Sequence, residues 1–225
     1  NKLEFLLKFT NIQGDKSALR QQERSETMNP LKRIIPAFDD MSIDQAINLA
    51  AQLGSIPYAM KIHALFDEYG SLAIRKLQQT GIGRIWVDAK LHDIPRTVGL
   101  RAAKIREARA DILTVHASGG IEMMKAAVKR GPAEIYAITA LTSLTPKEIW
   151  DLYQRTPQEA VLFLACWALE AGVHGIVCSS QDVSTISADP DLRSLTKIVP
   201  GTRMLGSARQ DQQRVETPAV AIRGG

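Results

Sequence analysis

Short apolar runs alternate along this chain with longer stretches in which apolar residues recur at helical spacing. The runs, each of four to seven residues, are Ile34–Phe38, Tyr58–Ile62, Arg84–Val87, Ile112–Val115, Glu134–Ala140, Gly175–Cys178 and Thr196–Val199. The helical stretches are Ile43–Leu53, Ser71–Gln79, Val98–Ala108, Ile121–Lys129, Pro146–Tyr153, Pro157–Ala171 and Val183–Ile186. This alternation predicts an α/β fold with a parallel sheet covered by helices. Seven strands at this spacing fit a TIM-type (β/α)₈ barrel better than an open doubly wound sheet.

The two ends of the chain depart from this alternation. Residues 1–30 include a polar, charged stretch, and we expect them to form an N-terminal extension that is partly helical or disordered. Residues 31–225 are the expected barrel domain. Their pattern predicts neither an eighth strand nor a final helix, so we expect this domain to be C-terminally incomplete. A barrel of that kind has an unpaired edge, which the rest of a longer chain or a partner element would cover.

Composition narrows the class of protein. Hydrophobic residues make up 45% of the chain and charged residues 23%, as in ordinary globular proteins. The net charge of +4 comes from scattered Lys and Arg without a long basic run, so we expect an anionic small substrate and no nucleic acid. No apolar stretch approaches the ~20 residues of a membrane span, and no signal peptide is recognisable. The two cysteines, Cys166 and Cys178, lack metal-ligand spacing and are expected to be buried thiols in the cytoplasm.

Candidate chemistry is concentrated where the run Ile85–Val87 meets three charged residues, Asp88, Lys90 and Asp93. On a strand, Asp88 and Lys90 share one face because they are two residues apart. A lysine between two carboxylates stays protonated and becomes a positioned proton donor. The alternative is a surface ion pair at a strand end.

Other polar residues and turn residues fall at matching places in the pattern. Asp39, Lys61, Asp88, Ser143 and Pro200 lie at or just past the C-terminal ends of expected strands. Barrel enzymes build their active sites at that face. Surface charges without a function would be scattered over both ends, so the clustering favours an active site.

Seven blocks of the sequence together resemble the orotidine 5′-phosphate decarboxylase family, from about Ile34 onward. These blocks are Ala37–Asp39, Lys61, Asp88–Thr97, His116–Gly120, Leu141–Ser143, Pro200–Arg203 and Asp211–Pro218. One such block is weakly specific, whereas several in the family's order at barrel spacing are strongly so. The resemblance implies decarboxylation of orotidine 5′-monophosphate (OMP) to UMP, a step of pyrimidine synthesis, without a metal or cofactor.

The resemblance also implies roles for the charged residues. Asp88 would lie beside the substrate carboxylate, and Lys90 would deliver a proton to the carbanion left by carbon dioxide. Lys61 and Asp93 would complete an alternating array that holds Lys90. Family members are homodimers with shared active sites, in which residues matching Asp93, Ile94 and Thr97 reach the partner subunit's site.

Six further positions match substrate-binding residues of the family: Asp39, Thr142, Ser143, Pro200, Arg203 and Gln212. Asp39 would bind the ribose, and the Thr142–Ser143 pair would read the pyrimidine. Arg203 and Gln212 would lie on a mobile loop that closes over the phosphate. His92 is expected to pack or hydrogen-bond behind the site and His116 to brace the barrel rim, and neither is expected to react.

Some positions depart from the family's pattern. His63 replaces a usual glycine and Arg96 a common asparagine, and the glycine–arginine pair that grips the phosphate on strand eight has no match. One rival is the magnesium-binding sugar-phosphate branch of the superfamily, which has a carboxylate where this chain has Lys61. A lysine would repel a divalent cation there. The second rival is a barrel that binds a ligand or partner without turnover.

Overall fold

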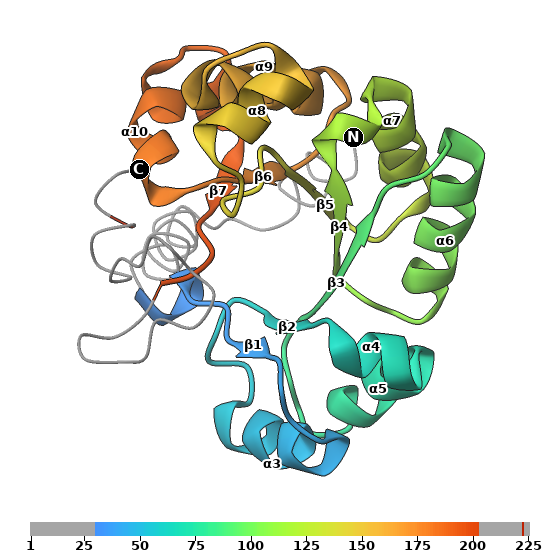
Figure 1. Ribbon diagram of the computed structural model, residues 1–225. Coiled ribbons are helices and arrows are strands. Elements are labelled where there is room, and N and C mark those ends of the chain that lie inside the picture. The colour runs from blue at the N-terminus through green and yellow to red at the C-terminus, as the bar shows by residue number, and fades with distance from the viewer. Residues whose placement is uncertain (1–29, 203–221, 223–225) are drawn as a thin grey trace, which may run out of the picture.

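The computed structural model describes residues 30–202 and residue 222, and the structural statements below concern these residues. Seven strands form one sheet in sequential order, and every neighbouring pair is parallel. They are β1 (Ala37–Phe38), β2 (Met60–Ile62), β3 (Ile85–Leu91), β4 (Ile112–His116), β5 (Glu134–Ile138), β6 (Gly175–Val177) and β7 (Thr196–Ile198). The strands curve around a central axis (Figure 1).

Helices form the outer layer around these strands (Figure 1). The α-helices are α3 (Ile43–Leu53), α4 (Ala64–Tyr69), α5 (Ser71–Gln78), α6 (Pro95–Glu107), α7 (Ile121–Arg130), α8 (Pro146–Tyr153), α9 (Pro157–Glu170) and α10 (Ser180–Ala188). Short 3₁₀ turns are η1 (Pro30–Arg33), η2 (Ala117–Gly119) and η3 (Leu192–Ser194). The predicted α/β barrel class, with seven strands in the described part of the chain, is confirmed.

Local sequence explains where several helices begin. Ser42, Thr145 and Thr156 each form a capping box, in which the side chain accepts a hydrogen bond from the backbone N–H three residues on. A Gln or Glu at that third position accepts one in return from the backbone N–H of the capping residue. Helices α8 and α9 also have a proline in the first turn, where no backbone donor is needed.

The interior splits into two apolar regions on either side of the sheet. The larger region lies between the strands and the helices and includes Phe38, Leu113 and Leu164, all fully buried. The smaller one fills the barrel axis around Trp86 and Tyr136, whose ring centroids are 5.5 Å apart.

One hydrogen bond and one close backbone approach determine how Trp86 and Tyr136 pack in this inner region. The indole N–H of Trp86 donates to the Thr114 hydroxyl at 2.6 Å, which satisfies its one polar atom. A Cβ on Gly175 would lie 2.6 Å from the Tyr136 ring and 2.3 Å from the Thr196 carbonyl oxygen. Glycine at that position therefore lets the Tyr136 ring fill the barrel.

A polar cluster lies at the N-terminal end of the barrel. Glu134, the first residue of β5, accepts hydrogen bonds from Tyr58 at 2.8 Å, from Tyr136 at 2.8 Å and from the Arg84 guanidinium. Arg84 also stacks on the Tyr58 ring, 4.4 Å from its centroid. Burial alone would raise the pKa of Glu134, but these donors outweigh it and hold the pKa below its ordinary value.

Three expectations need correction. The apolar run at Val87 does not end the third strand, because β3 continues through Asp88 and Lys90 to Leu91. Helix α4 was not predicted; it has only six residues, too few to show a helical period. Cys178 is buried as expected, but Cys166 is exposed because it lies on the outer face of α9. No helix in the described part of the chain is long and apolar enough to cross a membrane.

Candidate active site

An irregularity in β3 places the charged residues of the site. Val87 pairs with Leu113 and Leu91 pairs with Val115, so four steps along β3 match only two along β4. The two additional residues form a β-bulge, a device that re-aims side chains near active sites. Lys90 lies inside this bulge with φ of 45°, a left-handed conformation that a residue with a side chain rarely adopts.

Four charges form a chain of direct contacts at the C-terminal ends of β1, β2 and β3. The Lys61 ammonium lies 3.3 Å from an Asp39 oxygen and 3.0 Å from an Asp88 oxygen. The Lys90 ammonium lies 2.7 Å from the same Asp88 oxygen. The array therefore alternates in sign, in the order Asp39, Lys61, Asp88, Lys90.

Register explains how residues far apart in sequence meet here. Ala37 is the partner of Lys61 across β1 and β2, and Lys61 is the partner of Trp86 across β2 and β3. Asp39 lies two residues beyond Ala37, and Asp88 lies two residues beyond Trp86. Side chains two apart on a strand share a face, so both carboxylates reach toward Lys61.

Burial and charge set the ionisation of this array. The Asp88 side chain is only 9% exposed. Burial alone would raise the pKa of Asp88, but the Lys61 and Lys90 ammonium groups outweigh it and lower that pKa. Burial alone would lower the pKa of Lys61, yet Asp88 and Asp39 hold it above its ordinary value. At neutral pH the site therefore holds an ionised carboxylate with a cation on each side.

The lysine between two carboxylates is Lys61, not Lys90 as the spacing suggested. In the described part of the chain the ammonium of Lys90 makes an ion pair with Asp88 alone. Asp93 is exposed and accepts a hydrogen bond from the Ile94 backbone N–H at 2.6 Å. Its spacing from Lys90 did not bring the two side chains together, because the chain turns away after Leu91 to begin α6.

The other expected site residues lie around the same face. Ile94 is 64% exposed at the start of α6, and Thr97 lies in the first turn of that helix. Thr142 and Ser143 lie in the turn between β5 and α8, several residues beyond the strand, and Pro200 follows β7. Within the described residues, no hydrogen bond or ion pair joins any of these five to the charged array. Arg203 and Gln212 lie outside the described residues.

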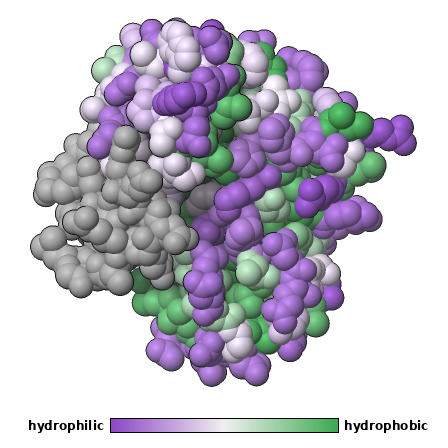
Figure 2. Space-filling model, in the orientation of Figure 1, coloured by the Kyte–Doolittle hydropathy of each residue, from purple (hydrophilic) through white to green (hydrophobic). Residues whose placement is uncertain are grey.

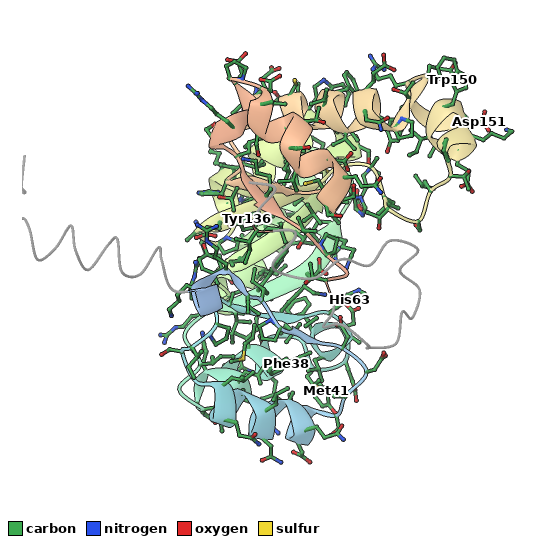
Figure 3. All side chains as sticks on the ribbon, turned by 90° about the vertical axis from the view of Figure 1, so that its left-hand side faces the viewer. Phe38, Met41, His63, Tyr136, Trp150 and Asp151 are labelled. Atoms are coloured by element: carbon green, nitrogen blue, oxygen red, sulfur yellow. The ribbon has the colours of Figure 1, made fainter. Side chains whose placement is uncertain are left out.

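Two views of the molecule show the face of the barrel at the C-terminal ends of the strands (Figures 2 and 3). In Figure 3, His63 after β2 and Trp150 of α8 lie toward one side, and Tyr136, inside the barrel, lies toward the other. Figure 2 looks onto the face of the loops that follow the strands, and hydrophilic residues gather about its centre. Sequence reasoning placed His92 behind the site and His116 at the barrel rim; the structure puts their rings in contact, 5.4 Å between centroids, directly after the bulge.

This geometry suits proton transfer to a bound anion. A protonated lysine that touches a buried, ionised carboxylate can donate a proton, and the carboxylate keeps it charged until it does so. No group of three or more His, Cys, Asp or Glu side chains in the described ranges has the geometry to hold a metal ion. Lys61 also occupies the space between the two carboxylates that a cation would need.

The parallel barrel strands, the surrounding helices and the charged array at the C-terminal strand ends define an α/β-barrel protein of the enzyme type. Comparison of the sequence with protein families is consistent with that class. The chain belongs to the orotidine 5′-phosphate decarboxylase / HUMPS family, whose sequence model matches residues 32–225.

Individual relatives and solved structures agree. An orotidine 5′-phosphate decarboxylase of Anaeromyxobacter sp. is 40% identical over 202 residues, covering 88% of each chain. One of Idiomarina loihiensis is 36% identical over 202 residues, covering 87% of each chain. The crystal structure of orotidine 5′-phosphate decarboxylase from Lactobacillus acidophilus superposes with a TM-score of 0.70 at 29% identity, covering 85% of this chain and 86% of that one.

Proposed function

We propose that this protein decarboxylates OMP to UMP and carbon dioxide in pyrimidine synthesis. Two lines of support converge: its relatives bear the name of that enzyme over most of their length, and the contact of Lys90 with Asp88 at 2.7 Å supplies the chemistry. That contact is the observation on which the proposal chiefly rests.

Asp88 would act on the ground state. Because its low pKa keeps it ionised, a substrate carboxylate brought beside it would meet a like charge in a poorly solvated site. Loss of carbon dioxide removes that substrate charge from the contact. The repulsion thus raises the energy of the bound substrate more than that of the transition state.

Lys90 would complete the reaction. The bond between C6 of the pyrimidine and its carboxyl carbon breaks, carbon dioxide leaves, and the electron pair stays on C6. The ammonium of Lys90 stabilises this charge and transfers a proton to it, giving UMP. The neutral amine then recovers a proton from solvent, so no electron donor or acceptor is needed.

The remaining residues would bind and orient the substrate. Lys61 and Asp39 hold Asp88 in place, and the carboxylate of Asp39, whose side chain is 42% exposed, would meet a ribose hydroxyl. Asp93, Ile94 and Thr97 would serve the partner's site in a homodimer, consistent with the exposure of Asp93 and Ile94 and the partial exposure of Thr97. The pyrimidine would lie against Thr142 and Ser143, with Pro200 on the opposite rim. Arg203 and Gln212 are the proposed phosphate ligands.

The direct test follows the absorbance of OMP during turnover by the purified protein. We expect Lys90→Ala to lower kcat at least about 100-fold, since general acid catalysis contributes on that order. Lys104→Ala is the matched control, because Lys104 is an exposed lysine whose one ion pair within residues 30–202 is with Glu107. It should leave kcat unchanged.

Two outcomes would contradict the proposal. Absence of turnover in a folded, dimeric preparation would favour a barrel that only binds. A large loss of rate on adding a chelator would revive the magnesium-dependent branch, which Lys61 between the carboxylates argues against.

A further inference from the structure

The β3 bulge has a second consequence, directly after Lys90. Because Leu91 pairs with Val115, the next residues of the two strands, His92 and His116, stand side by side. Their rings are 5.4 Å apart between centroids and tilted by 32°. With regular pairing from Val87 onward, Lys90 rather than His92 would have faced His116. The bulge therefore creates this ring pair.

Gly119, in the η2 turn after β4, also lies close to the His92 ring. A Cβ built on Gly119 would lie 3.0 Å from Cδ2 of His92 and 2.2 Å from the sulfur of Met123. The absence of a side chain at that position lets the imidazole pack close to the turn. His92 thus lies against the His116 ring and close to Gly119, and the residue is exposed.

Lys90 needs such support because of its backbone. A left-handed conformation costs a residue with a side chain about 1–2 kcal/mol, and it persists only where the surroundings enforce it. Upstream, the bulge is anchored by Asp88, which is buried and bonded to Lys61 and Lys90. Downstream, the anchors are the fully buried Leu91 and then the histidine pair.

We propose that His92 and His116 are positioning residues for Lys90: their ring contact fixes the downstream end of the bulge and so keeps the Lys90 ammonium on Asp88. This role rests on the proposed function of Lys90 as the proton donor. Neither ring touches the reacting carbon in this assignment. Each acts through the backbone between residues 90 and 92.

Burial, then the neighbouring His92 and Lys90, lower the pKa of His116, while Asp88 opposes them. A proton added to the His116 ring would place a cation in contact with the His92 ring. We therefore expect acid, by protonating His116, to loosen the ring contact and with it the bulge.

Two variants of His92 test whether the packing of its ring is what supports kcat. His92→Phe keeps a ring against His116 and Gly119, and its larger size is accommodated because the position is exposed. It should keep kcat for OMP within about twofold at neutral pH. His92→Ala should lower kcat by roughly ten- to a hundredfold, as expected for a reacting group displaced by about 1 Å, with little change in KM.

His174→Ala is the control for a purely structural loss. His174 lies at the N-terminal end of β6, where its ring nitrogen accepts a hydrogen bond from the Ile135 backbone N–H at 3.2 Å. Its removal should lower the melting temperature without changing kcat. If His92→Ala behaved in the same way, losing stability but not kcat, the positioning role would be overturned.

A third measurement is independent of catalysis and keeps this proposal separate from the proposed function. NMR titration of the histidine ring protons should show the pKa of His116 rising in His92→Ala, because one of the groups that lowers it is gone. No change would mean that the rings do not interact in solution, which would overturn the pairing itself. If the wild-type protein failed to turn over OMP while this shift appeared, the ring pair would stand and the proposed function would fall.

Discussion

Lys61 links the two carboxylates of the site, and its two contacts differ in how far they are exposed to solvent. Its ammonium contacts Asp88, which is almost buried, and Asp39, whose side chain is 42% exposed. The buried contact is the stronger of the two, since solvent screens an exposed ion pair. Removal of Lys61 would leave Asp88 in a poorly solvated position with Lys90 as its single cationic neighbour in the described array.

We predict that Lys61→Ala destabilises the protein by less than the about 3–5 kcal/mol that a buried charge without any partner costs, because Lys90 still pairs with Asp88. Loss of the ammonium also raises the pKa of Asp88, which Lys61 now lowers. A folded-state pKa below the ordinary value gives stability that is present above that value and is lost as pH falls. In the variant the acid decline of kcat should therefore begin at higher pH, and the stability that Asp88 contributes should be smaller and be fully lost at a higher pH.

Urea unfolding and a pH profile of kcat measure both effects. Lys61→Arg is the matched control, since it keeps a cation between the carboxylates. If Lys61→Ala unfolded at the same urea concentration as the wild type and kept its acid profile, the ionisation of Asp88 would not depend on Lys61.

At the scale of single elements, α9 shows how local sequence begins a helix far from the chemistry. Thr156 accepts a hydrogen bond from the Glu159 backbone N–H, and the Glu159 carboxylate accepts one in return from the Thr156 N–H at 2.9 Å. We predict that Thr156→Ala lowers the free energy of unfolding by about 1 kcal/mol and leaves kcat unchanged.

Chemical unfolding of Thr156→Ala beside Thr156→Ser checks this, since serine caps a helix as well as threonine does. An equal loss in both variants would show that the hydroxyl is not the source of the stability. A fall in kcat for Thr156→Ala would show that α9 influences the barrel mouth.

Elements with such local signals are those that the sequence predicts well. The bounds of α3 and α8 match the predicted ranges because Ser42 and Thr145 stand at their starts and apolar residues repeat within them. The extent of β3 was wrong because its bulge depends on pairing with β4, which no local signal reveals. Likewise, spacing suggested that Asp88 and Lys90 meet, whereas the contact of Lys61 with Asp39 depends on the register of β1 and β2.

At the scale of the whole molecule, the two ends of the barrel hold different charged networks. The array around Asp88 lies at the C-terminal ends of the strands, and the cluster around Glu134 lies at the N-terminal end. Glu134 receives donors from segments that precede β2 and β3 and from within β5, so it joins three parts of the sheet on both sides of β4. This separation allows the cluster to stabilise the barrel without contacting the site.

We predict that Glu134→Gln lowers the free energy of unfolding by about 1–3 kcal/mol and leaves kcat near the wild-type value. The pKa of Glu134 lies below its ordinary 4.5 in the folded protein. The stability that the ionised Glu134 carboxylate contributes is therefore fully present above pH 4.5. It is lost as the pH falls from there toward the folded-state pKa of Glu134.

Urea unfolding at pH 7 and below pH 4.5 tests whether the stability contributed by Glu134 falls in acid. The gap in stability between wild type and Glu134→Gln should narrow in acid, because the wild-type carboxylate then takes up a proton. A gap of constant size at both pH values would assign the effect to packing rather than to charge.

The unequal exposure of the two cysteines allows one of them to be labelled selectively. Cys178 is buried, and its thiol has a pKa of about 12, so hardly any reactive thiolate exists at neutral pH. Cys166 faces outward on α9. A maleimide dye should consequently attach at one position, on the outer helical layer and away from the strand ends, giving a fluorescent reporter of assembly without any engineered mutation.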